Sequence, residues 1–215
     1  MKTIEHKGNN LSFIISLPDN YDQSHDYGII FLMHGFGANM HDLVGISNAI
    51  NSNDFIFIFP NAPTELPMNF GGESYQWAPI GEPLKLQDSI NLMDATIEEV
   101  LKMFSIDKNR IFIGGFSQGG MMAIHGYLTK NSLFAGVIIL SSREITSLKS
   151  SFYARQNIRV FMAHGVNDSI ITIDDGRQTY NNLVKHNFNV DYYEYEMAHE
   201  IIEEELKDLK EWLEK

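Results

Sequence analysis

Ser117 lies between two glycines, at the point where a strand pattern ends and a helical pattern begins. Residues 110–114, Arg-Ile-Phe-Ile-Gly, favour a β-strand, and a helical pattern directly follows residues 115–119, Gly-Phe-Ser-Gln-Gly, which fit G-x-S-x-G. A sharp turn from strand to helix holds such a serine in a strained conformation with its hydroxyl exposed, and glycine avoids clashes on either side. The motif therefore predicts that Ser117 is a nucleophile for acyl transfer. The alternative is a glycine-rich helix start that the Ser117 hydroxyl caps.

A serine hydroxyl needs a base, and the base needs an acid that orients it. Ligands of open α/β sheets bind beyond the carboxyl ends of the strands, so acids and histidines just after a strand are the best candidates. Asp168 follows the strand expected at 158–164, and His199 follows the strand expected at 190–196. We predict that Asp168 is the acid and His199 the base. The order Ser117, Asp168, His199 is that of α/β-hydrolases.

Other acids and histidines have simpler interpretations. Asp174 and Asp175 are the rivals of Asp168, but they fall in the expected first turn of a helix, where acidic side chains stabilise the helix dipole. Four further histidines have positions that suggest structural roles. Two end strands in His-Gly pairs, one lies inside the helix after Ser117, and one lies near a helix C-terminus. They are expected to be structural: His34, His164, His125 and His186.

Two backbone amides are expected to stabilise the oxyanion of the reaction intermediate. The first is the amide of Gln118, because it lies at a helix N-terminus, where N–H groups are unpaired and the dipole favours negative charge. The second follows the strand expected at 28–34. There, Gly35 and Gly37 let the backbone turn so that the amide of Phe36 faces the pocket. The alternative for this stretch is an ordinary strand-to-helix loop.

Short runs of β-branched and aromatic residues alternate with helical patterns along the chain. Most runs are continuously apolar, which is typical of strands covered on both faces. Strands are expected at residues 11–17, 28–34, 55–60, 110–114, 136–141, 158–164 and 190–196. Helices are expected at residues 90–104, after the serine, and at 174–186 and 202–213. This alternation predicts one α/β domain over residues 1–215, with a mainly parallel central sheet and helices on both faces.

Residues 61–86 form a long connection for a compact domain. Five of the six prolines lie from Pro60 to Pro83, and the apolar content of the segment is not typical of disorder. We expect the segment to pack on the core, to form a wall or lid over the active site, or to do both. Several flexible apolar residues are candidates either to line an apolar site or to pack in the core: Met40, Met68, Met121, Met197 and Ile170.

The composition excludes several classes of protein. The 215 residues contain no cysteine, so a disulfide scaffold, a thiolate metal site and a cysteine nucleophile are excluded. The formal net charge of −12 argues against nucleic acid as a partner. The sequence shows no signal-peptide pattern and no membrane-length apolar run, so we expect a cytoplasmic protein without integral membrane association. We expect no metal or organic cofactor, and exposed apolar loop residues make a homodimer a candidate assembly.

Five stretches of the chain resemble a known family. FLMHGFGANMHDL, FPNAP, GFSQGG, HGVNDSIIT and MAHEI are similar to motifs of the carboxylesterase/phospholipase family of α/β-hydrolases, which includes the acyl-protein thioesterases. The resemblance runs from about Tyr27 to the C-terminus. It implies a small, nearly lidless serine hydrolase of the α/β-hydrolase fold that cleaves esters or thioesters with acyl chains. It also implies roles as nucleophile, acid, base and the two amide donors for Ser117, Asp168, His199, Phe36 and Gln118.

Three places depart from the usual family pattern. Ala198 stands where the family has a glycine before the histidine, residues 71–80 follow the family's tryptophan-containing loop only loosely, and Leu-Ser-Ser at 140–142 replaces Leu-Ser-Gly. These changes leave the chemistry intact and bear on the choice of substrate. Two alternative functions remain open: a peptidase or lactone hydrolase with the same triad, and a ligand-binding protein that uses a hydrolase fold.

Overall fold

The structure of the chain is a computed structural model that describes residues 1–51, 53–67, 72–128, 133–148 and 158–215. Within these residues, eight strands form the main sheet in the order β1-β2-β4-β3-β7-β8-β9-β10. Strand β2 pairs antiparallel with β1 and with β4, and the other neighbours pair parallel. The strands are β1 (Lys2–Lys7), β2 (Ser12–Leu17), β3 (Tyr27–Met33), β4 (Phe55–Pro60), β7 (Ile106–Phe116), β8 (Gly136–Leu140), β9 (Arg159–Gly165) and β10 (Asn189–Tyr195).

All seven strands expected from the sequence are present, with small shifts at their ends. Strand β7 differs most, because it begins at Ile106 instead of at Arg110. Strand β1 is an addition to the prediction. It lies at the edge of the sheet with mostly exposed side chains, so it carries no buried apolar run that would mark it in the sequence.

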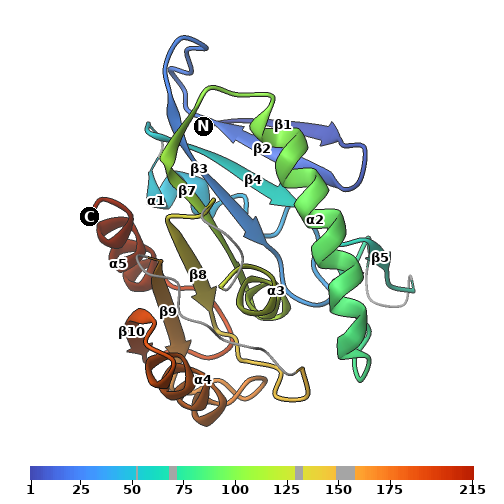
Figure 1. The fold of residues 1–215 in the computed structure, drawn as a ribbon, viewed down its shortest axis with the longest axis vertical. Helices are drawn as coiled ribbons and strands as arrows, with labels where there is room; N and C mark the ends of the chain where they lie inside the picture. Colours follow the sequence, from blue (N-terminus) through green and yellow to red (C-terminus); the bar gives the residue numbers. More distant parts are fainter. Residues whose placement is uncertain (52, 68–71, 129–132, 149–157) are drawn as a thin grey trace.

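Helices cover both faces of the sheet (Figure 1). Successive side chains of a strand point to opposite faces. Strand β3 therefore contributes Ile29 and Phe31 to a core cluster with α2, α3 and α4, and Ile30 and Leu32 to a second cluster with α1 and α5. This arrangement confirms the predicted α/β fold. The helices in the described part of the chain are α1 (Ile46–Ile50), α2 (Leu86–Leu101), α3 (Gln118–Tyr127), α4 (Ile173–Lys185) and α5 (Glu203–Leu213).

The long connection 61–86 contains two short antiparallel strands, β5 (Thr64–Glu65) and β6 (Tyr75–Gln76), and a 3₁₀ helix, η2 (Pro83–Lys85). Tyr75 exchanges backbone hydrogen bonds with the loop after β3: its carbonyl accepts from Gly37 at 2.9 Å, and its amide donates to Ala38 at 2.9 Å. The described part of the connection thus packs against that loop. Met68, one of the candidate apolar residues, lies outside the described residues.

Strands β3, β7, β8, β9 and β10 are parallel neighbours, so their carboxyl ends lie along one edge of the sheet. The segments that follow these strands carry every residue predicted to take part in the reaction. The fold therefore places residues that are far apart in sequence on neighbouring loops.

Candidate active site

Ser117 lies between the last residue of β7 and the first residue of α3. Its φ of 54° and ψ of −115° belong to a region that side-chain-bearing residues rarely adopt. The backbone is held there from both sides, because the Ser117 amide donates to the Leu140 carbonyl at 2.9 Å and the Ser117 carbonyl accepts from Met121 at 3.1 Å. The hydroxyl makes no capping hydrogen bond to α3, which argues against the helix-cap alternative.

The glycines on either side of Ser117 are required by a close approach of three backbone segments. A Cβ atom on Gly115 would lie 2.5 Å from the Met33 carbonyl oxygen, and a Cβ on Gly119 would lie 2.1 Å from the same atom. No side chain fits at such distances. The turn after β7 is therefore packed against the end of β3, which carries the other candidate oxyanion loop.

The structure brings the three predicted side chains into contact. His199 Nε2 lies 3.0 Å from Ser117 Oγ, and His199 Nδ1 lies 2.7 Å from Asp168 Oδ2. The carboxylate can only accept, so Nδ1 carries the proton and Nε2 is left to accept the hydrogen bond from the serine hydroxyl. Ser117 and Asp168 are 8% and 6% exposed, and the part-buried ring of His199 packs on Phe116. The chain can therefore pass the serine proton to an oriented imidazole.

Further contacts hold Asp168 in place. Its Oδ1 atom accepts hydrogen bonds from the amides of Ile170 at 2.8 Å and Ile171 at 2.9 Å. His164 Nε2 donates to the Ile171 carbonyl at 2.8 Å and lies 3.6 Å from Asp168 Oδ2. These contacts aim Oδ2 at His199. An aspartate at the start of a turn is the sequence signal for such amide contacts, and the contribution of His164 has no comparable signal.

The two candidate oxyanion segments flank Ser117. Gln118 is the first residue of α3, which places its amide at the start of the helix. In the loop after β3, a Cβ on Gly35 would lie 3.4 Å from Ser117 Cβ, so this loop lies directly against Ser117. Gly37 has a φ of 80°, which favours glycine. Phe36 lies between these two glycines, and its role as a donor stays a prediction.

The side chain of Gln118 joins the long connection 61–86 to the site. Its Oε1 atom accepts from the Trp77 amide at 2.7 Å, and its Nε2 atom donates to the Ala78 carbonyl at 2.7 Å. The buried indole of Trp77 in turn donates to the His34 carbonyl at 2.9 Å. Both candidate oxyanion segments are therefore held by the same short stretch of chain. The only sequence signal for this contact is a tryptophan in a segment without regular periodicity.

The histidines expected to be structural hold loop backbone. His34 Nδ1 donates to the Gly35 carbonyl at 2.7 Å, and its Nε2 accepts from the Ala62 amide at 3.1 Å. His125 Nε2 accepts from the Ile145 amide at 2.9 Å. Burial lowers the pKa of His34 and of His125 to about 4, so both rings are neutral near pH 7.

The rivals of Asp168 lie in the first turn of α4, as predicted. The Asp174 side chain is 89% exposed and lies 3.8 Å from Arg177. Asp175 accepts from the Thr172 hydroxyl at 3.0 Å. His186, at the other end of α4, makes a hydrogen bond to the Asn182 carbonyl at 2.8 Å. The structure thus pairs His199 with Asp168 and leaves these residues in roles at the ends of the helix.

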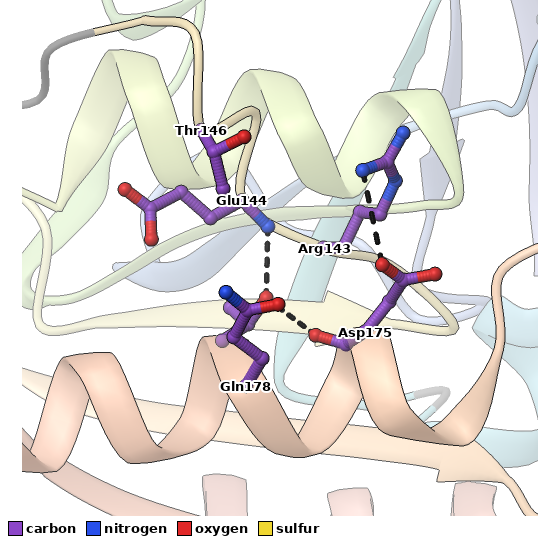
Figure 2. Close-up of a pocket in the computed structure, with 6 residues that line it drawn as sticks. Arg143, Glu144, Thr146, Asp175 and Gln178 are labelled. Carbon is purple, nitrogen blue, oxygen red and sulfur yellow. Dashed lines mark hydrogen bonds and ion pairs between the residues drawn. The ribbon is translucent and has the colours of Figure 1, made fainter.

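A polar hollow of about 180 Å³ lies between α4 and the loop after β8. Figure 2 shows how its walls are joined. The Glu144 amide donates to Thr179 Oγ1 at 2.9 Å, and Arg143 Nη1 lies 3.9 Å from Asp175 Oδ1. These contacts attach the loop after β8 to α4.

The candidate apolar residues fall into different environments. Ile170 is 71% exposed beside Asp168, whereas Met197 is buried in the core. Met40 and Met121 are half-buried. Among the residues that the structure describes, no cluster of three or more His, Asp or Glu could hold a metal ion, and no helix has the length and apolar character to cross a membrane.

The parallel sheet between two layers of helices, with a serine at the turn from β7 to α3, defines an α/β-hydrolase. The sequence profile of the phospholipase/carboxylesterase family matches residues 19–215, and the chain belongs to this family. The resemblance noted in the motifs is therefore confirmed.

Named relatives agree with this placement. Probable feruloyl esterase C of Aspergillus terreus is 30% identical over 188 residues, which cover 83% of this chain but 63% of the relative. Acyl-protein thioesterase 1 of Cryptococcus neoformans is 29% identical in an alignment of 223 positions, gaps included, that covers 89% of this chain and 92% of the relative.

Solved structures show the same fold. Esterase PE8 has a TM-score of 0.82 at 19% identity and covers 95% of this chain, with 98% of its own chain matched. A carboxylesterase from Mesorhizobium loti has a TM-score of 0.83 at 14% identity, with 99% and 98% covered. At these identities the similarity establishes the α/β-hydrolase fold alone.

Proposed function

We propose that the chain is a serine carboxylesterase or thioesterase in which Ser117 is the nucleophile, His199 the base and Asp168 the acid. One observation carries the proposal: the contacts of 3.0 Å and 2.7 Å that link Ser117 Oγ through His199 to Asp168. Membership of the phospholipase/carboxylesterase family supports ester chemistry. The triad alone does not, because peptidases use the same arrangement.

In the first half-reaction, Ser117 Oγ attacks the substrate carbonyl while His199 Nε2 takes the hydroxyl proton. Asp168 stabilises the imidazolium that forms and keeps the ring in the reactive orientation. The amides of Gln118 and Phe36 bind the oxygen on which negative charge develops. His199 then returns the proton to the departing alcohol or thiol, and the acyl group remains on Ser117.

In the second half-reaction, water attacks the acyl-enzyme by the same route. His199 removes a proton from the water, the two amides again bind the oxyanion, and Ser117 leaves with the proton from His199. Every step uses side chains and amides of this chain.

The substrate class that we propose is a small carboxylic ester or thioester. The names of the relatives, feruloyl esterase and acyl-protein thioesterase, support both kinds of bond. A peptidase or lactone hydrolase is the alternative. We further propose that residues 1–215 form one domain and that the protein acts in the cytoplasm. We propose no nucleic-acid partner, and the candidate assembly is a homodimer. The described part of segment 61–86 is proposed to wall the active site through its contacts with Gln118.

The test is Ser117→Ala. In the wild type we expect turnover of p-nitrophenyl esters and covalent labelling by a fluorophosphonate. Without the nucleophile, kcat should fall by about 10⁴-fold or more and labelling should disappear, while circular dichroism stays unchanged. Ser24→Ala, in an exposed turn, is the matched control and should keep full activity. Retention of turnover by the Ser117 variant would refute the assignment.

A second measurement decides the bond. Rates on matched p-nitrophenyl esters and p-nitroanilides should favour the ester, whereas faster cleavage of the anilide would point to the peptidase alternative. A series of esters with increasing acyl length then separates short-chain from long-chain substrates.

A further inference from the structure

Ser142 places a second hydroxyl against the turn that holds Ser117. It follows β8, is fully buried, and its Oγ atom donates to the Ser117 carbonyl oxygen at 2.7 Å. The first turn of α3 makes room for it, because a Cβ on Gly120 would lie 2.5 Å from Ser142 Cβ.

The carbonyl that Ser142 contacts belongs to the same peptide unit as the Gln118 amide. This unit is planar and trans, so its C=O and N–H groups point in opposite directions. The Ser117 carbonyl points into the protein, where it accepts hydrogen bonds from Ser142 Oγ at 2.7 Å and from the Met121 amide at 3.1 Å. Fixing the carbonyl therefore fixes the direction of the opposite N–H. Hydrogen bonding at the carbonyl also polarises the peptide and strengthens the N–H as a donor.

The loop that carries Ser142 is itself held on three sides. The Ser141 amide donates to the Ala163 carbonyl at 2.9 Å, which attaches the loop to β9. The Glu144 amide donates to Thr179 Oγ1 at 2.9 Å, which attaches it to α4 (Figure 2). The Ile145 amide donates to His125 Nε2 at 2.9 Å, which attaches it to α3. Ser142 is therefore a fixed donor.

We propose that Ser142 is a positioning residue for the oxyanion site: its hydroxyl orients and polarises the Ser117–Gln118 peptide, so that the Gln118 amide binds the tetrahedral intermediate more tightly than the substrate. This inference rests on the proposed function of Ser117 and Gln118. It predicts an effect on the transition state and none on the ground state, because the intermediate carries the negative charge that the amide binds.

The experiment compares Ser142→Ala with Ser141→Ala. Ser141 is adjacent and buried, and its hydroxyl has no hydrogen-bond partner among the described residues, so it is a matched control. With p-nitrophenyl esters, Ser142→Ala should lower kcat by about 10-fold with little change in KM, because a donor is weakened and not removed. Ser142→Cys, with a weaker donor of similar size, should fall between the wild type and Ser142→Ala. Ser141→Ala should match the wild type.

An aryl trifluoromethyl ketone separates this role from general packing. Ser117 Oγ adds to the ketone carbonyl, its proton passes to His199, and the ketone oxygen becomes an oxyanion at the two amides. Ser142→Ala should bind this inhibitor about 10-fold more weakly than the wild type. Binding of the product carboxylic acid and the melting temperature should change little.

The outcomes separate the two proposals. If Ser117→Ala is inactive but Ser142→Ala and Ser141→Ala show equal kcat and equal ketone affinity, the role of Ser142 is refuted and the proposed function stands. A rise in KM for Ser142→Ala with unchanged kcat also overturns the inference. If Ser117→Ala keeps the wild-type activity, the proposed function itself fails.

Discussion

Two buried carboxylates near the end of the chain have opposite environments. Asp168, in the loop after β9, has donors at both oxygens: the amides of Ile170 and Ile171 at Oδ1 and His199 at Oδ2. Glu205, in the first turn of α5, is fully buried, and neither of its oxygens accepts a hydrogen bond of normal geometry from the described residues. Burial is therefore similar at the two positions, and the supply of donors differs.

The difference shows that burial alone does not hold a carboxylate in the position that the proposed reaction requires. The donors around Asp168 hold its carboxylate at a defined position next to His199. At Glu205, burial raises the pKa to about 8, and the nearby Ile202 amide only partly opposes this shift. Glu205 is therefore mostly protonated near pH 7. Because it loses this proton at higher pH, it makes the stability of the fold depend on pH.

Of the substitutions that test this comparison, Asp168→Asn should have the largest effect, and the effect is on kcat. The amide oxygen of Asn can still accept from Ile170 and Ile171, so we expect the fold to persist. The charge that stabilises the protonated His199 is lost, and the ring can adopt the wrong tautomer, so kcat should fall by about 10³- to 10⁴-fold. Steady-state kinetics on a p-nitrophenyl ester, with circular dichroism for the fold, measures both expectations.

Asp174→Asn serves as the control for that experiment, since it changes an exposed acid of the same loop region at the start of α4. Its activity should remain within about 2-fold of the wild type, because its side chain interacts with Arg177 at the surface. A loss in Asp174→Asn as large as that in Asp168→Asn would mean that the acid has been assigned to the wrong residue.

Glu205→Gln tests the carboxylate that accepts no hydrogen bond of normal geometry from the described residues. The folded-state pKa of about 8 lies above the ordinary value of 4.5, so the folded chain retains a proton that the unfolded chain releases between these pH values. The stabilisation is fully present below about pH 4.5 and is lost as the pH rises towards 8. Gln does not titrate, so thermal unfolding at pH 8 should occur at a temperature about 5 °C higher in the variant, with a smaller difference at pH 5.

Glu204→Gln is the matched control because Glu204 lies in the same first turn of α5 but is exposed to solvent, so its carboxylate is not subject to the burial that acts on Glu205. Glu204→Gln should show any loss of melting temperature that comes from removing an acid at the start of the helix. It should not show the rise in melting temperature at pH 8 that is expected for Glu205→Gln. If Glu204→Gln and Glu205→Gln have the same melting temperatures at pH 5 and at pH 8, the buried carboxyl does not titrate as stated.

The smallest effect is expected at a carboxylate with strong donors but little burial. Glu194, near the end of β10, accepts from Arg177 Nε at 2.8 Å and from Arg177 Nη2 at 2.7 Å on the surface. Solvent and salt screen such a pair. Glu194→Gln should therefore lower the melting temperature by about 1 °C, and the difference should shrink further in 1 M NaCl. A large loss that persists in salt would show that donors matter even without burial.

The strands of the central sheet could be predicted because strands buried on both faces are continuous apolar runs. Strand β1 and the start of β7 could not be predicted in this way, since their side chains are largely polar and none of them is buried. Helix α1 has five residues, too few for a helical period to show. The contact of Gln118 with Trp77 joins residues 41 positions apart in sequence, and no local pattern indicates it.

The sequence by itself determined the α/β class, predicted the turn around Ser117 and singled out Asp168 and His199 as candidates, because these inferences depend on periodicity, on glycine and on position after a strand. The tertiary structure alone decided that His199 lies 3.0 Å from Ser117 Oγ, that Asp168 accepts well-formed hydrogen bonds whereas Glu205 does not, and that Ser142 contacts the Ser117 carbonyl. The physical reason is the short range of a hydrogen bond compared with the separation of these residues along the chain. A hydrogen bond requires atoms within about 3 Å, and the packing of strands and loops that are distant in sequence sets such distances.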